Sequence, residues 1–189
     1  MDQHQLTLVV VVIAAVVVIA ALSFLFSRKR RSQRLRQRFG PEYDRVLRKE
    51  GDAKRAEGVL EMRAQRHEKF TLRPLSESAR ADFAERWRMV QEQFVDEPKG
   101  SVAQADLLVS ELMEARGYPV ADFEQRAADI SVDHPVVVEN YRAAHNIALR
   151  HGRGEASSED MRKALLHYRA LFEELLGPTP TTERKEKRA

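Results

Sequence analysis

The amino-terminal part of the sequence contains one long run of apolar positions. Leu6 to Phe26 holds 21 residues without a charged side chain. A helix rising 1.5 Å per residue would make this run about 31 Å long, which matches the roughly 30 Å hydrocarbon core of a bilayer. The pattern predicts a transmembrane helix over residues 6–26, after a short extracytoplasmic segment over residues 1–5.

Basic residues flank this run on one side only. The juxtamembrane segment 27–38 is rich in Lys and Arg, and no Lys or Arg precedes the run. The positive-inside rule therefore predicts a single-pass protein of the cell membrane, with its N-terminus outside and its C-terminal domain in the cytoplasm. An uncleaved anchor is favoured over a signal peptide, because signal peptides have a positive n-region and an apolar region of about 7–15 residues.

The basic segment is a candidate site of contact with anionic lipid in the bilayer. Its members are Arg28, Lys29, Arg30, Arg31, Arg34, Arg36 and Arg38. A second interpretation, that they only stop translocation and orient the helix, stays open. Nucleic acid is an unlikely partner, because this cluster would lie against the membrane and residues 46–177 hold 20 basic against 24 acidic side chains.

Residues 39–74 are rich in charge, with few apolar positions. Gly40-Pro41 favours the start of a short helix, and Gly51-Asp52 interrupts it. No heptad order is sustained over the helical stretch that follows. We expect a charged helical spacer here, exposed to solvent.

From residue 75 to residue 177 the apolar positions recur at helical spacing. The clearest stripe, at i, i+4, i+7 and i+11, is formed by Phe83, Trp87, Val90 and Phe94. No stretch sustains the period-two alternation of a strand. The chain is therefore predicted to be all-α, with a soluble helical bundle of about four to five helices over 75–177 and a disordered tail over 178–189.

Polar residues and glycines mark the expected ends of these helices. Short polar side chains that accept hydrogen bonds from the first helical turn favour a helix start, and glycine favours a helix end. The predicted starts are Ser76 or Ser78, Ser101, Asp133, and Ser157 or Ser158; the predicted ends are Gly117 and Gly177.

The amino-acid composition excludes several kinds of functional site. The chain of 189 residues has no Cys, which excludes disulfide scaffolds, thiol nucleophiles and Cys-ligated zinc. Its closest histidine pair, His145 and His151, lacks the i, i+3 or i+4 spacing of a zinc site on a helix. We expect neither a metal nor another cofactor.

One group of residues keeps a catalytic alternative open. Asp133 and His134 lie just before a predicted long helix, and Glu139 and His145 follow on it. A carboxylate beside a histidine is typical of general acid–base catalysis, so these four residues would serve a small hydrolase or a metal-dependent enzyme. The favoured interpretation is structural, with Asp133 as the cap and His134-Pro135 as the first turn.

Several stretches of the sequence resemble a known family in their residues, and not only in their helical periodicity. They are RFGPEYDR (38–45), RWRMVQEQFVDEP (86–98), GYPVADFEQRAADISVDHPVVVENYRAAHNIALRHGRGEAS (117–157) and HYRALFEELL (167–176). With them the chain resembles a bacterial family of short single-span proteins described as uncharacterised membrane or secreted proteins. The resemblance covers about residues 38–176 and implies no activity, ligand or catalytic residue.

These observations favour a non-enzymatic, membrane-anchored helical interaction or scaffold module at the cytoplasmic face. A protein partner is expected, and the pattern identifies neither that partner, nor the oligomeric state, nor the process.

Overall fold

A computed structural model describes the backbone of residues 3–177, together with the side chains except for part of those before Lys29. The expected disordered tail, residues 178–189, lies outside the described residues. So do the first two residues of the expected extracytoplasmic segment 1–5.

The described chain is all-α, as predicted. Residues 3–177 form eight helices and no strand. Their bounds are α1 (Gln3–Phe39), α2 (Pro41–Glu50), α3 (Ala53–His67), α4 (Glu77–Gln93), α5 (Pro98–Ala115), α6 (Phe123–Ile130), α7 (Val138–Gly152) and α8 (Ser158–Leu176). Among the residues open to this test, no helix combines the length and the apolar character needed to cross a membrane.

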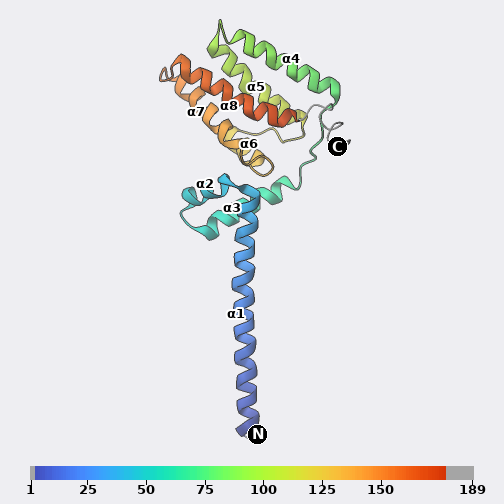
Figure 1. Cartoon of the computed structure of the whole chain (residues 1–189), viewed down its shortest axis with the longest axis vertical. Coiled ribbons are helices and arrows are strands. Elements are labelled where there is room, and N and C mark those ends of the chain that lie inside the picture. Colours follow the sequence, from blue (N-terminus) through green and yellow to red (C-terminus); the bar gives the residue numbers. More distant parts are fainter. Residues whose placement is uncertain (1–2, 178–189) are drawn as a thin grey trace, which may run out of the picture.

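Helices α4 to α8 form the predicted helical bundle. Helix α8 packs against both α5 and α7, α4 packs on α5, and the short α6 contacts α7 (Figure 1). Trp87 on α4 lies in the core, where its ring stacks on Phe172 of α8 with centroids 4.6 Å apart. The stripe of apolar positions that includes Trp87 thus faces inward, as its spacing indicates.

Most predicted helix ends have the expected chemistry. The Ser76 hydroxyl accepts a hydrogen bond from the Ala79 N–H at the start of α4. Ser157 and Asp160 form a reciprocal capping box at the start of α8, and Gly177 follows its last residue. Gly51 and Asp52 separate α2 from α3.

Two predicted helix starts are wrong. Helix α5 begins at Pro98, so Ser101 lies inside it and is fully buried. Helix α7 begins at Val138, and Asp133 lies in the preceding turn instead of capping it. A proline lies at each place: Pro98 is the first residue of α5, where its fixed φ and missing N–H suit a first helical turn, and Pro135 opens the turn over residues 135–137 that precedes α7.

The segment predicted to be a solvent-exposed spacer is folded instead. Helices α2 and α3 pack on each other and on the end of α1, and together they enclose a second hydrophobic core. Its buried members are Leu35, Phe39, Tyr43, Val46, Ala56, Leu60, Ala64 and Val132. We call residues 35–67 the neck. The prediction missed this core because its members also include Leu35 of α1 and Val132 of the bundle, which lie outside residues 39–74.

The neck joins two very different parts of the molecule. Helix α1 leaves it on one side as a single long helix, and the bundle sits on the other side (Figure 1). The contacts that hold bundle and neck together therefore decide how the bundle is oriented relative to α1.

Candidate functional site

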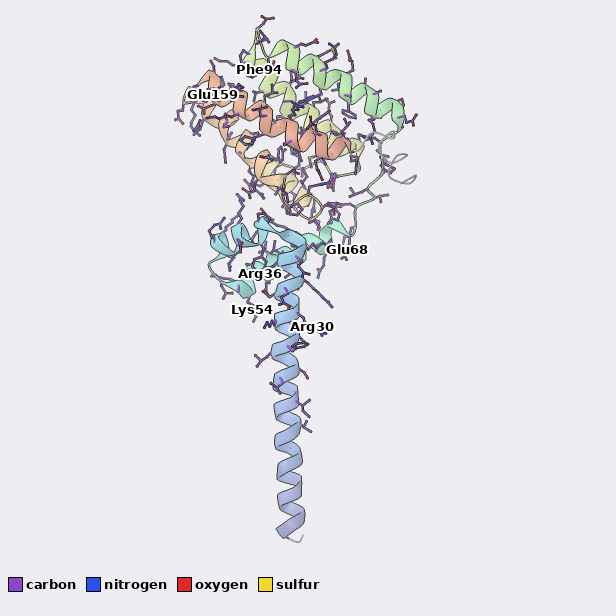
Figure 2. All side chains as sticks on the ribbon, viewed as in Figure 1. Arg30, Arg36, Lys54, Glu68, Phe94 and Glu159 are labelled. Carbon is purple, nitrogen blue, oxygen red and sulfur yellow. The ribbon has the colours of Figure 1, made fainter. Side chains whose placement is uncertain are left out.

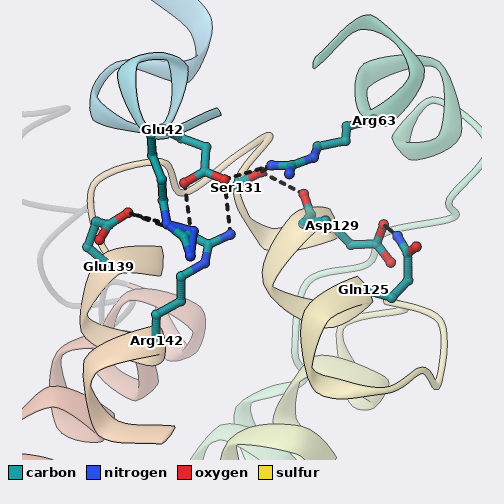
Figure 3. A network of polar contacts seen from close by, with 9 residues as sticks. Glu42, Arg63, Gln125, Asp129, Ser131, Glu139 and Arg142 are labelled. Carbon is teal, nitrogen blue, oxygen red and sulfur yellow. Dashed lines mark hydrogen bonds and ion pairs between the residues drawn. The ribbon is translucent and has the colours of Figure 1, made fainter. Parts of the chain in front are cut away.

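A buried ionic network connects the neck to the bundle (Figure 3). The carboxylate of Glu42 on α2 is fully buried. It accepts two hydrogen bonds of 2.9 Å from Arg142 on α7, and one of 2.7 Å from Arg63 on α3. Arg63 also donates to the Ser131 hydroxyl, 3.2 Å away, just after α6. One carboxylate thus binds two guanidinium groups from two other helices.

Local structure explains how each side chain reaches this point. Glu42 lies in the first turn of α2, where the helix dipole favours a negative charge. Arg142 lies on α7 one residue after the buried Tyr141 and four after the buried Val138, so it shares their inward face. Arg63 lies three residues after Leu60, whose side chain is in the neck core.

A second buried carboxylate, Asp129 on α6, extends the network. It accepts a 3.0 Å hydrogen bond from Arg66 on α3 and a 2.7 Å bond from Gln125. Asp129 is only 1% exposed, so the Arg66 side chain partly neutralises a charge that water cannot reach. We call Glu42, Arg63, Arg66, Asp129, Ser131 and Arg142 the neck–bundle junction.

The electrostatics of the junction depend on the Glu42–Arg142 pair. Burial lowers the pKa of the Arg142 guanidinium below its ordinary value, and the charge of Glu42 opposes this shift. Arginine keeps its proton in proteins, so Arg142 remains a cation. The pair is therefore two opposite charges held out of water, an arrangement that is stable only while both partners are present.

A second connection lies at the end of α3. The Nε2 atom of His67 is 2.7 Å from Oδ2 of Asp133, without the alignment of a hydrogen bond. The Tyr118 hydroxyl donates to the same oxygen over 3.3 Å. Burial raises the pKa of Tyr118, and the Asp133 charge raises it further, so Tyr118 acts as a neutral donor. Asp133 thus links the neck to the bundle rather than capping a helix.

The four residues of the catalytic alternative have separate surroundings. Asp133 contacts His67 and Tyr118, whereas His134 is 2.9 Å from Glu174 on α8. Glu139 lies 3.7 Å from both Arg45 and Arg142.

His145 is the fourth, and its ring stacks on Phe123 with centroids 3.6 Å apart. Burial lowers the pKa of His145. The described contacts therefore do not bring the four side chains together into one site.

None of these four residues lines the three hollows that follow. A groove of about 400 Å³ runs between α3 and α6 beside the junction, and a second of about 460 Å³ lies at the end of the bundle near His151. A third, of about 410 Å³, lies between α1 and α3. No group of three or more His, Asp or Glu side chains suited to a metal ion occurs among the residues whose side chains are described.

The predicted lipid-contact residues lie on the last turns of α1, and those after Arg28 are exposed. Arg31 forms a two-fold ion pair with Glu61 of α3. The guanidinium of Arg36 lies 4.6 Å from the ring centre of Tyr43, and that of Arg30 lies 4.3 Å from the ring centre of Phe26. In Figure 2, Arg36 lies at the level of the neck, and Arg30 lies farther along α1 toward its N-terminus.

The chain was compared with protein-family models, with curated proteins and with solved structures, and none of the three comparisons found a match.

The junction residues were not predicted from the sequence. Glu42, Arg63 and Arg142 are separated by 21 and 79 positions and have the same appearance in sequence as any solvated charge. One signal could have found Arg142, since it continues the apolar stripe of Val138 and Tyr141 at i+4 and i+1. The ion pairs and hydrogen bonds of the junction connect α2 with α3 and α7, and α3 with α6.

Proposed function

We propose that this chain is a non-enzymatic scaffold that a single helix anchors in a membrane, and that it holds a helical interaction bundle at the cytoplasmic face. The neck–bundle junction is the observation that carries the proposal. A bundle on a flexible tether would sample many orientations, whereas buried ion pairs between α2 and α7 restrict it to one. Such a restriction serves a protein that must present one surface at a set place above the membrane.

Support for the anchor comes from the sequence and from exposure. Residues 6–26 are uncharged over a length that matches a bilayer, and basic residues follow them. Large apolar side chains along this part of α1, among them Ile13, Val16 and Ile19, are 59–63% exposed. Lipid would cover this surface, which nothing in the described part of the chain covers.

Support for an interaction role comes from the bundle. Exposed aliphatic side chains occur on three of its helices: Leu107 on α5 is 59% exposed, Leu149 on α7 is 51% and Leu166 on α8 is 47%. The candidate catalytic residues have separate partners, as described above. Partner binding is therefore the function that the surface of the bundle supports best.

Photo-crosslinking in intact cells tests the proposal. A benzoylphenylalanine would replace Leu107, Leu149 or Leu166 in the full chain, and the matched control would carry it at Met62, an apolar neck residue that is 62% exposed. We expect a light-dependent protein adduct of discrete mass from at least one bundle position, none from Met62, and recovery of the chain with the membranes. Recovery of the chain in the soluble fraction, or no protein adduct from all three bundle positions, would contradict the proposal.

A further inference from the structure

A basic pocket lies between α1 and α3, at the point where α1 leaves the neck. Its volume is about 410 Å³. It is lined by Ser27, Arg30, Arg31, Arg34, Leu35 and Glu61. Three guanidinium groups and one carboxylate give this lining a formal charge of +2, and a hydroxyl adds a hydrogen-bond donor.

The lining residues from α1 share one face of that helix. Ser27, Arg30, Arg31, Arg34 and Leu35 follow the i, i+3, i+4, i+7, i+8 spacing. Arg30 and Arg34 are thus like charges four residues apart, which repel each other in the absence of an anion. Arg34 has no hydrogen-bond or ion-pair partner among the described side chains, so its guanidinium group is free to bind an anion.

Glu61 pairs with one of the three guanidinium groups of the pocket, that of Arg31. Arg31 binds the Glu61 carboxylate through two of its nitrogens, in the fork arrangement that guanidinium groups also use for phosphate. Glu61 thus holds one guanidinium at the pocket wall, and the charges of Arg30 and Arg34 remain uncompensated. Two positive charges around a hollow suit a monoanionic or dianionic phosphate.

The position of the pocket along α1 indicates the source of that phosphate. Arg31, near its centre, is five residues beyond Phe26, which is the last residue of the apolar run; at 1.5 Å per residue this is about 7.5 Å. The headgroup layer on each side of a bilayer is about 5–8 Å thick, from the difference between 40–45 Å in total and 30 Å of hydrocarbon. We propose that this α1–α3 pocket binds the phosphate of an anionic phospholipid, an inference that rests on the anchoring of α1 proposed above.

Native mass spectrometry of the full chain in a neutral detergent tests the inference. Phosphatidylglycerol is titrated in, and the bound lipids are counted; phosphatidylcholine and inorganic phosphate form the two comparison arms. We expect one phosphatidylglycerol per chain to be retained preferentially over phosphatidylcholine. Arg34→Gln weakens this retention by about tenfold, because a charge-assisted hydrogen bond is lost.

The matched control is Arg48→Gln, which removes the same charge from an exposed position of α2, outside both the pocket and the basic segment 27–38. We expect it to change retention by less than about twofold, and Arg34→Lys to fall between the two because it keeps the charge but not the fork. Equal losses from Arg34→Gln and Arg48→Gln would overturn the pocket and leave the membrane anchor standing. Equal retention of phosphatidylglycerol and phosphatidylcholine, or displacement of the lipid by equimolar inorganic phosphate, would overturn the headgroup as its ligand. Failure of the unmodified chain to fractionate with membranes would instead contradict the anchor.

Discussion

Arg142 donates two hydrogen bonds of 2.9 Å to the carboxylate of Glu42, a residue 100 positions earlier in the chain. Both side chains are buried, with exposed fractions of 6% and 0%. Because one residue belongs to the neck and the other to the bundle, this pair is one of the contacts that join the two hydrophobic cores. The orientation of the bundle therefore depends on charges that have no access to water.

Replacing Glu42 by Gln should destabilise the full chain by about 3–5 kcal/mol, because Arg142 and Arg63 would keep buried charges without a counter-ion. Urea denaturation in detergent, followed by circular dichroism, measures this loss. The matched control is Glu139→Gln, whose side chain is 48% exposed and 3.7 Å from Arg142; it should cost less than about 1 kcal/mol. Equal costs for the two variants would show that the junction does not hold neck and bundle together.

The folded neck predicts a contrast between two neighbouring residues of α3. Leu60 is fully buried, so Leu60→Ala should cost about 2–5 kcal/mol through lost burial and the cavity left behind. Met62 is 62% exposed, and Met62→Ala should change stability by less than about 0.5 kcal/mol. Denaturation curves of both variants test the neck core directly. A solvent-exposed spacer would show two equally small effects.

Gly117 allows the chain to turn sharply after α5. Its φ is +93°, and a Cβ atom there would collide with the carbonyl oxygen of Thr71. Gly117→Ala should therefore destabilise the bundle by more than about 1 kcal/mol, from strain together with the clash. Gly58, inside α3, has open space where a Cβ would lie, so Gly58→Ala should stabilise the chain by up to about 1 kcal/mol. A shift of the two melting temperatures in the same direction would refute this assignment.

The stability of the bundle should decrease as the pH decreases, because of His145. Burial lowers its folded pKa, Arg126 lowers it further, and Asp106 opposes the shift. The unfolded chain, with a His pKa near 6.5, therefore binds more protons than the folded chain as the pH falls below that value. His145 thus destabilises the fold in acid and has no such effect above about pH 7.

Urea midpoints measured between pH 5 and pH 8 for the unmodified chain and for His145→Gln isolate this contribution, because the other histidines are present in both. We expect the unmodified chain to lose more stability in acid than the variant. Parallel pH profiles would assign the acid sensitivity to other groups.

Much of the bundle was predictable from local pattern. The stripe from Phe83 to Phe94 and the caps Ser76 and Ser157 follow from interactions within one helix, which depend on residues three or four positions apart. The same reasoning failed at Asp133, whose partners His67 and Tyr118 come from distant segments. A turn that begins at Pro135 also delays the start of the long helix to Val138, five residues after Asp133.

The neck and its junction could not be predicted in this way. The neck core also includes Leu35 from α1 and Val132 from the bundle, so residues 39–74 alone do not show all of its apolar positions. Glu42 and Arg142 are charged residues that sequence reasoning assigns to the solvent. Only the fold, which brings Glu42 of α2 within hydrogen-bond distance of Arg142 of α7, makes them a buried pair.

We propose above that α1 crosses a membrane and that the junction holds the bundle at its cytoplasmic side. The most direct test uses the lack of native cysteines. Single cysteines are introduced separately at Gln3 and at Ser158, and intact cells are treated with a membrane-impermeant maleimide. With the N-terminus outside and the bundle in the cytoplasm, we expect labelling at position 3 and none at position 158 until the cells are permeabilised. Labelling at position 158 in intact cells would contradict it and place the bundle on the opposite side of the membrane.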